Sequence, residues 1–219
     1  MHASDSFAWC AIEIASVAPQ AWRNGGGLTR ELLRVPDGAQ WGCRISVAEI
    51  VRDGPFSTFP GIERHFALIE GGGLALQLSE QQLDCAPGHP PVVFDGAQAC
   101  RAVPGAGLVR VCNLMLARER ASGQMIRSSE GGSLDLRVAA GQLLAVLALE
   151  PVVLGGDKGI TEPLAAGHLH WVLRPIDTQE HFLQLHGASV VMQVQFQLGD
   201  TPRNESTSEL SCRAVSPLA

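Results

Sequence analysis

The sequence predicts an all-β fold made of two β-barrels or sandwiches that pack on each other. Its 24 glycines and 13 prolines punctuate the chain and leave short apolar runs between them, a pattern typical of strands joined by turns. Val190–Leu198 alternates apolar residues with Gln193, Gln195 and Gln197, which predicts a strand with one wet face. No long segment shows the 3.6-residue period of an amphipathic helix.

The predicted strands follow one another along the whole chain. In order they are Ala11–Val17, Thr29–Val35, Trp41–Val51, His65–Glu70, Leu74–Leu78, Val92–Phe94, Leu108–Ala117, Leu134–Ala139, Leu143–Leu149, Val152–Leu154, His170–Leu173, Phe182–Leu185 and Val190–Leu198. Ala139–Leu149 is apolar enough for a helix, but Gly141 and Pro151 favour a buried strand. For Gly155–Gly167 the pattern leaves a strand and a short helix open.

A polar stretch, Arg118–Gly132, divides these strands into two groups of similar number. We therefore expect one domain at residues 1–118 and a second at residues 119–198, packed together because the connection is short. Residues 199–219 are polar and aperiodic, so we expect a disordered tail there.

Composition excludes several classes of protein. Sixteen Lys and Arg oppose 22 Asp and Glu, for a net charge of -6, and no basic cluster offers a surface for nucleic acid. No apolar run approaches the ~20 residues of a membrane span, and the N-terminus does not resemble a signal peptide. The six cysteines form no C-x-x-C pair, so we expect free thiols and a cytoplasmic protein. Exposed sheet edges would suit a homodimer.

The first candidate for a binding site is the glycine-rich segment Trp22–Glu31. Its glycines allow backbone amides to converge on a ligand, but a strand follows where a phosphate loop requires a helix. A tight turn and a ligand loop both fit. In the second case the ligand would meet Asn24, Gly25, Gly27, Thr29 and Glu31.

Two predicted strands carry polar side chains on one face. Arg44 and Ser46 alternate with a plainly apolar face, so they line either solvent or a polar cavity. Trp41 precedes them and leaves room for a ligand beside the short Ser46. Asn113 lies in a second apolar strand, where a buried amide needs backbone, water or a ligand as partner.

The loop Asp53–His65 contains two Phe and two Pro, which are costly to expose, so it must pack down on the protein. Phe56, Ser57 and Phe59 lie in it, and Arg64 follows. A guanidinium beside aromatic rings suits a carboxylate, which it grips with two hydrogen bonds. The alternative is a salt bridge from Arg64 to a neighbouring Glu.

Together these segments resemble the HutD/Ves family. The residues that carry the resemblance are Trp22-Arg23-Asn24-Gly25-Gly26-Gly27-Leu28-Thr29-Arg30-Glu31, Trp41 with Arg44-Ile45-Ser46-Val47-Ala48, Gly54-Pro55-Phe56-Ser57-Thr58-Phe59-Pro60-Gly61-Ile62-Glu63-Arg64, and Asn113-Leu114-Met115. The match covers about residues 18–120. One departure is Phe94-Asp95-Gly96-Ala97, where Ala97 replaces an expected Asp at one edge of the pocket.

The resemblance implies a double-cupin (bicupin) fold whose N-terminal cupin-like half holds the ligand pocket. It also implies a non-catalytic, regulatory role in histidine utilisation, with formylglutamate, formiminoglutamate or urocanate as ligand. The alternative is a cupin enzyme, an isomerase or a metal-dependent oxygenase acting on a small acid. Cupins often hold a metal through His-x-His with a Glu three or four residues later. Here only His168 and His170 approach that spacing, and Glu180 lies too far along the chain. We therefore expect no metal, cofactor or catalytic residue.

Overall fold

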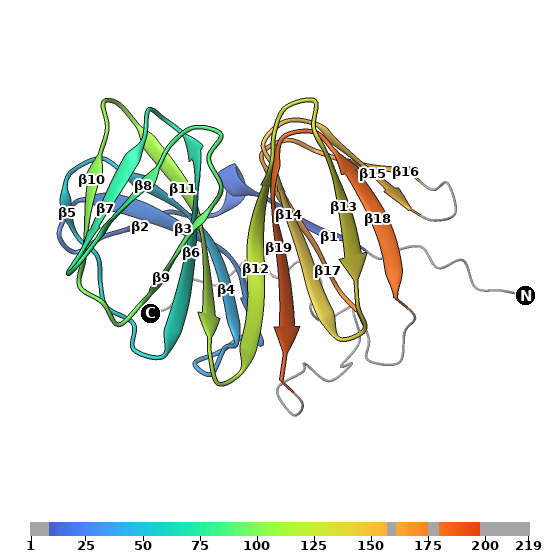
Figure 1. Cartoon of the computed structure of the whole chain (residues 1–219), viewed down its shortest axis with the longest axis horizontal. Coiled ribbons are helices and arrows are strands. Elements are labelled where there is room, and N and C mark those ends of the chain that lie inside the picture. Colours follow the sequence, from blue (N-terminus) through green and yellow to red (C-terminus); the bar gives the residue numbers. More distant parts are fainter. Residues whose placement is uncertain (1–8, 157–160, 175–179, 198–219) are drawn as a thin grey trace, which may run out of the picture.

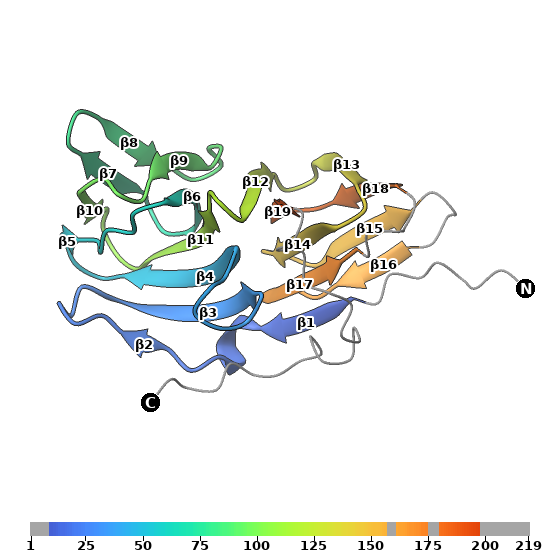
Figure 2. The ribbon, with the colours of Figure 1, turned by 90° about the horizontal axis from the view of Figure 1, so that it is seen from below.

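The computed structural model describes residues 9–156, 161–174 and 180–197, and these residues form four stacked β-sheets (Figures 1 and 2). The first outer sheet contains β5 (Gly54–Pro55), β10 (Cys100–Pro104), β7 (Leu74–Leu78) and β8 (Gln82–Cys85), in that order. The first inner sheet contains β2 (Gln20–Ala21), β3 (Gly27–Val35), β4 (Cys43–Ile50), β11 (Val109–Ala117), β6 (Ile62–Glu70) and β9 (Val92–Asp95).

The second half repeats this arrangement. The second inner sheet contains β1 (Cys10–Glu13), β17 (His168–Leu173), β14 (Gln142–Ala148), β19 (Ser189–Phe196) and β12 (Ala121–Ser128). The second outer sheet contains β13 (Ser133–Val138), β18 (His181–His186), β15 (Val152–Gly156) and β16 (Thr161–Leu164). A short 3-10 turn, η1 (Ile14–Ser16), follows β1. The predicted all-β, two-part fold is confirmed, and each half is a two-sheet sandwich.

Apolar side chains fill the space between each pair of neighbouring sheets. The largest core lies between the two inner sheets, where Ile45 and Leu114 of the first half meet the layer of Leu147 and Met192. Separate cores lie inside the first sandwich and inside the second. Arg127 also donates a hydrogen bond to the carbonyl of Leu68 across the seam. The two halves are therefore joined by a buried apolar layer.

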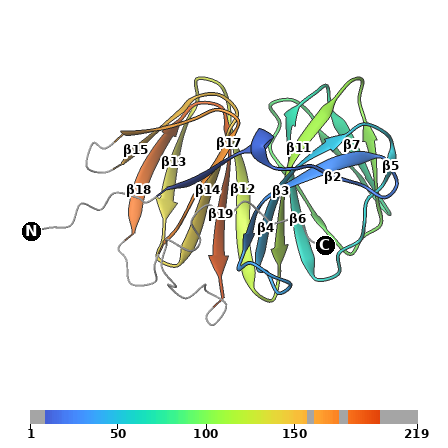
Figure 3. The ribbon, with the colours of Figure 1, turned by 180° about the vertical axis from the view of Figure 1, so that it is seen from behind.

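The N-terminal strand crosses the domain boundary expected at residue 118. β1 pairs antiparallel with β17, so residues 10–13 belong to a sheet of the second half. Figure 3 shows β1 lying along the second half before the chain turns into the first. The chain thus starts in one sandwich, builds the other, and returns.

One local prediction was wrong, one open alternative was decided, and one prediction held only in part. The expected polar connection contains the strand β12, and residues 161–164, where a helix was left open, form the strand β16. The glutamine face of β19 is wet at Gln195 and Gln197, which are exposed, but at Gln193 it packs on the second outer sheet, where the buried side chain donates 2.7 Å to the carbonyl of Arg137. The predicted tail lies outside the described residues.

Gly123 explains why β12 escaped prediction. A glycine inside a polar stretch suggests a turn. Here a Cβ on Gly123 would lie 2.4 Å from the carbonyl oxygen of Gln193, so only glycine lets β12 approach β19 this closely. The residue that interrupts the pattern therefore serves the strand pairing.

Two further features bear on the class of protein. Cys43, Cys85, Cys100 and Cys112 are free thiols, and Cys212 lies outside the described residues. No helix within residues 9–156, 161–174 and 180–197 is long and apolar enough to cross a membrane.

Candidate functional site

Polar side chains gather on the face of the first inner sheet that looks into the first sandwich. Because successive residues of a strand face opposite ways, the strand register defines rows across this face. One row, read across the sheet, is Arg34, Arg44, Met115, Arg64 and Phe94. The next row is Glu31, Ser46, Asn113, Phe66 and Val92. The face expected to be solvent or a cavity is therefore interior.

Arg64 is the central residue of this site. Its side chain is 6% exposed, and its guanidinium carbon lies 4.8 Å from the ring centre of Phe66 and 5.2 Å from those of Phe56 and Phe94. Phe59 adds a fourth ring at 5.6 Å. No carboxylate of the described residues pairs with Arg64, and its buried Nε has no hydrogen-bond partner among them. The alternative of a salt bridge to a neighbouring Glu is not observed.

Burial makes this cation costly to hold. Desolvation lowers the pKa of Arg64 to about 10; the Cys100 thiol opposes this shift and the charge of Arg44 adds to it. The ring faces stabilise the cation in part, since each carries a negative quadrupole. An anion bound here would offset the repulsion between the charges of Arg64 and Arg44. It would also accept two charge-assisted hydrogen bonds from the guanidinium of Arg64.

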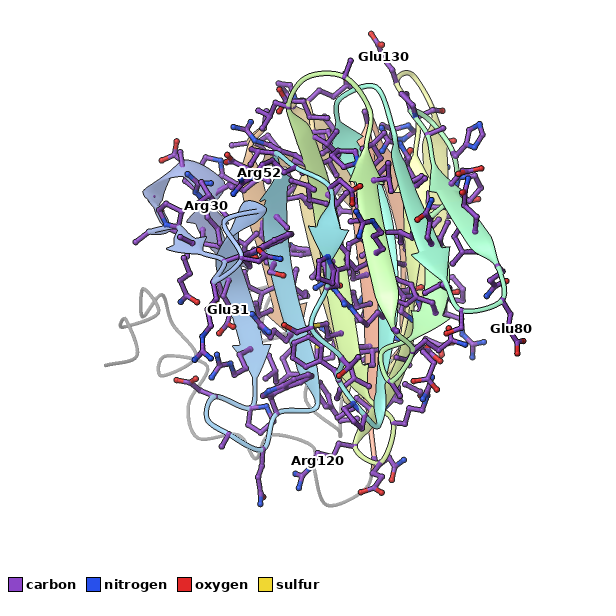
Figure 4. All side chains as sticks on the ribbon, turned by 90° about the vertical axis from the view of Figure 1, so that its left-hand side faces the viewer. Arg30, Glu31, Arg52, Glu80, Arg120 and Glu130 are labelled. Carbon is purple, nitrogen blue, oxygen red and sulfur yellow. The ribbon has the colours of Figure 1, made fainter. Side chains whose placement is uncertain are left out.

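The one carboxylate in these two rows is already engaged. Glu31, 4% exposed, lies 2.5 Å from Arg44 Nε and also pairs with Arg34. A β-bulge at Leu32 brings Arg34 onto the same face as Glu31, although plain alternation would separate them. Figure 4 shows Glu31 on β3, between the levels of Arg52 and Arg120 at opposite ends of the half. The guanidiniums of Arg34 and Arg44 thus share one carboxylate, and Arg64 has no part in it.

Ser46 and Asn113 form a neutral polar pair beside Arg64. They lie opposite each other on β4 and β11, and Asn113 Nδ2 donates 3.4 Å to Ser46 Oγ. Ser46 is 1% and Asn113 6% exposed. The Oδ1 atom of Asn113 is buried without a partner among the described residues, and such atoms usually mark a water or ligand.

Thr29 lies in the next row of the same face, opposite Ala48, and contacts the indole of Trp22. The indole Nε1 of Trp22 donates 2.8 Å to its hydroxyl, and the Trp22 ring meets Phe56 edge-on at 5.5 Å. Phe56 in turn stacks on Phe66 at 5.7 Å. Thr29 therefore helps to orient the ring wall around Arg64.

The glycine-rich segment forms a turn at the sheet edge. The Asn24 side chain accepts from Gly26 N at 2.9 Å and donates 3.2 Å to the carbonyl of Pro55, while Arg52 donates 2.7 Å to the carbonyl of Gly25. A Cβ on Gly27 would lie 2.3 Å from the carbonyl of Glu49. These contacts support the tight-turn interpretation and fix the loop that carries Phe56.

The aromatic loop is clamped by the segment that departs from the family pattern. Phe59 N donates 2.6 Å to the carbonyl of Gly96, and Gly96 N donates 2.8 Å to that of Ile62. Asp95 accepts from Ala97 N at 2.8 Å, so an Asp at position 95 closes this turn although position 97 is Ala. Ser57 in the same loop is exposed.

The structure does not join every predicted residue to the cluster. Trp41 is half-buried just before β4, and its neighbour Gly42 lies against Phe196 at the seam. Conversely, sequence reasoning missed Trp22, Arg34 and Phe66. Phe66 had a usable signal, because it shares the strand face of Arg64.

His168 and His170 each lie beside a backbone carbonyl. His168 Nδ1 lies 2.9 Å from the carbonyl of Ala166, and His170 Nε2 lies 3.3 Å from that of Ala165. No group of three or more His, Cys, Asp or Glu suited to a metal ion occurs in the described ranges.

Two packed β-sandwiches, one with buried polar residues in its interior, define a bicupin-type protein. A cupin 2 conserved barrel domain protein from Leptotrichia buccalis has this fold, with a TM-score of 0.51, 8% identity, and coverage of 89% of this chain and 99% of that one. The model of the HutD family matches residues 14–192, so the chain belongs to the HutD family.

Relatives agree with this assignment. Protein Ves of Citrobacter koseri is 33% identical over 111 residues, 50% of this chain and 58% of that protein. An uncharacterized 21.2 kDa protein in the hutC 3' region of Pseudomonas putida is 34% identical over 45% of this chain and 53% of its own length. These matches span little more than half of each relative.

A solved structure of HutD from Pseudomonas fluorescens SBW25, in a formate condition, superposes with a TM-score of 0.75 at 23% identity. It covers 87% of this chain and 100% of that one. The HutD family is linked to histidine utilisation.

Proposed function

We propose that the first sandwich binds a small organic acid and that the protein is a non-catalytic, cytoplasmic regulator in histidine utilisation. One observation carries the proposal: Arg64 is a buried guanidinium among four phenylalanine rings, with no carboxylate of the described residues paired to it. Buried charges are normally paired, so the partner is expected to be a ligand anion.

The surrounding charges favour the same class of ligand. Arg34, Arg44 and Arg64 face Glu31 alone in the two polar rows, so the local charge is positive. A carboxylate fits the two-pronged geometry of arginine, and the rings exclude water from the contact. Within this class of ligand we propose formylglutamate, formiminoglutamate or urocanate.

The test is binding by calorimetry and thermal shift, in a chloride buffer free of carboxylates. A bound acid at ~100 times its dissociation constant adds ~2.7 kcal/mol to the free energy of unfolding. Arg64→Met should weaken binding about 30- to 5,000-fold, the cost of removing one member of a desolvated charge pair. Arg101→Met is the matched control, because Arg101 is exposed and pairs with exposed Asp53. Equal binding by wild type and Arg64→Met would refute the site.

Two further measurements test the role. The acid should be recovered chemically unchanged after incubation with stoichiometric protein, as followed by NMR; conversion of the acid would contradict a non-catalytic role. A bacterial strain whose gene for this protein encodes Arg64→Met should differ in growth on histidine from a strain whose gene encodes Arg101→Met.

A further inference from the structure

Cys100 places a nucleophilic side chain in the interior that holds Arg64. On β10, Cys100 is buried and the next residue, Arg101, is exposed, so the thiol points into the first sandwich. Cys100 belongs to the same buried cluster as Phe66 and Phe94, two of the rings around the Arg64 guanidinium. The thiol and the guanidinium therefore share one interior, and acid binding by itself gives the thiol no role.

A backbone hydrogen bond ties Cys100 to the ring wall around Arg64. Phe56 N donates 2.8 Å to the carbonyl of Cys100, and the Phe56 ring centre lies 5.2 Å from the guanidinium carbon of Arg64. Arg64 is 6% exposed, and its buried Nε has no hydrogen-bond partner among the described residues. An acid bound to Arg64 would therefore lie in the same interior as the thiol.

The surroundings of Cys100 favour a reagent that carries a negative charge. Burial raises the pKa of the Cys100 thiol, and the charge of Arg64 opposes this shift. Because the thiolate is the nucleophile, a neutral reagent that arrives from bulk water should react slowly. A carboxylate held by Arg64 would instead keep its reagent beside the thiol, which raises the effective concentration of the reagent.

Building on the acid-binding function proposed above, we infer that Cys100 is a covalent modification site for electrophilic carboxylic acids. Arg64 binds the carboxylate, and the sulfur of Cys100 bonds to the electrophilic carbon. With an α,β-unsaturated acid the sulfur adds to the β-carbon, the π bond breaks, and the thiol proton ends on the α-carbon, so the step needs no co-reactant. The adduct leaves a tethered carboxylate beside Arg64 and closes the site to other acids.

The experiment compares iodoacetate with iodoacetamide, which alkylate a thiol by the same displacement and differ in charge. In both cases the sulfur–carbon bond forms, iodide leaves, and the thiol proton passes to water. Peptide mass spectrometry gives the rate of alkylation at Cys100 in the folded protein, and the ratio of the iodoacetate rate to the iodoacetamide rate is compared with that of glutathione. The ratio for wild type should exceed that of glutathione about 10- to 1,000-fold, since an electropositive cleft concentrates anions.

Two arginine variants separate binding by Arg64 from general attraction of the anion. Arg64→Met should return the ratio to that of glutathione. Arg101→Met removes the exposed arginine next to Cys100 in the sequence and should leave the ratio high. Cys85→Ser, which removes a second buried thiol of the same cluster, should also leave the ratio high.

The alkylated protein gives a second measurement, which stands even if Arg64→Met does not fold. Wild type alkylated by iodoacetate at Cys100 should no longer bind glutarate in calorimetry. It should also melt at a higher temperature than protein alkylated by iodoacetamide, because the tethered carboxylate pairs with Arg64.

A ratio at Cys100 equal to that of glutathione, or no alkylation of Cys100 in the folded protein, would overturn the modification site. Glutarate binding by wild type that is lost in Arg64→Met would then show that the acid site itself stands. If wild type binds no acid and Cys100 shows no preference for iodoacetate, the acid-binding function fails, and this inference with it.

Discussion

Replacing Arg64 with Met should abolish acid binding without destabilising the ligand-free protein. A protein loses about 3–5 kcal/mol of stability when one member of a buried ion pair is removed. Arg64 has no such partner among the described residues, and burial lowers its pKa to about 10. The ordinary pKa is about 12.5, and each tenfold change in proton affinity is worth about 1.4 kcal/mol, so holding the charge costs about 3 kcal/mol.

The contacts of Arg64 with the aromatic rings oppose the gain in stability that removal of the buried charge would give. The rings of Phe56, Phe59, Phe66 and Phe94 stabilise the guanidinium, at about 0.5–2 kcal/mol for a well-placed ring. Methionine restores part of this, since a thioether beside an aromatic ring is worth about 0.3–1.5 kcal/mol. The expected change in the free energy of unfolding therefore runs from none to a gain of about 3 kcal/mol.

The assay is urea denaturation of both proteins at pH 7.5 without carboxylate buffers, with equal m-values required for the comparison. A loss of more than about 2 kcal/mol in Arg64→Met would refute the reasoning, because it would show that Arg64 is paired and structural.

The same comparison has a pH dependence of known sign. Because burial lowers the pKa of Arg64 to about 10 in the folded state, the unfolded chain binds more protons above that pH. Wild-type stability should therefore rise relative to Arg64→Met as the pH increases from about 9 to 11. A constant difference across this range would contradict the buried, charged state of Arg64.

Three more predictions follow from other contacts. Glu31→Gln should lower the free energy of unfolding by about 2–4 kcal/mol, because Arg34 and Arg44 lose their shared carboxylate. The loss is smaller than for a fully buried ion pair, since both arginines are partly exposed. An unchanged urea midpoint would contradict this prediction. Gly123→Ala should cost about 1–3 kcal/mol by forcing β12 from β19, whereas Gly155→Ala, with its nearest atom at 3.6 Å, should be tolerated. Burial raises the pKa of Cys43 and that of Cys112, the latter to about 12, so both should resist thiol reagents at pH 8 until denaturant is added; rapid labelling of native protein would show otherwise.

The sequence by itself determined the fold class and the chemical character of the site. Alternation along the strand at Trp41–Val51 separated an apolar face from the face of Arg44 and Ser46, and the apolar run around Asn113 indicated a buried amide in need of a partner. The Phe- and Pro-rich loop ahead of Arg64 indicated a shielded cation. These signals are local, because they depend on a period of two residues and on the cost of burying polar groups or exposing rings.

Only the tertiary structure determined which part of the protein each of these strand faces packs against. The bulge at Leu32 turned Arg34 toward Glu31, and the pairing of β1 with β17 placed the N-terminal strand in the second half. Both outcomes depend on which strands meet, and strand pairing joins residues far apart in sequence. The lack of a carboxylate beside Arg64 among the described residues is an outcome of the same kind. A charge is paired or unpaired only once all neighbouring strands are in place, so the pattern of residues along the chain does not predict it.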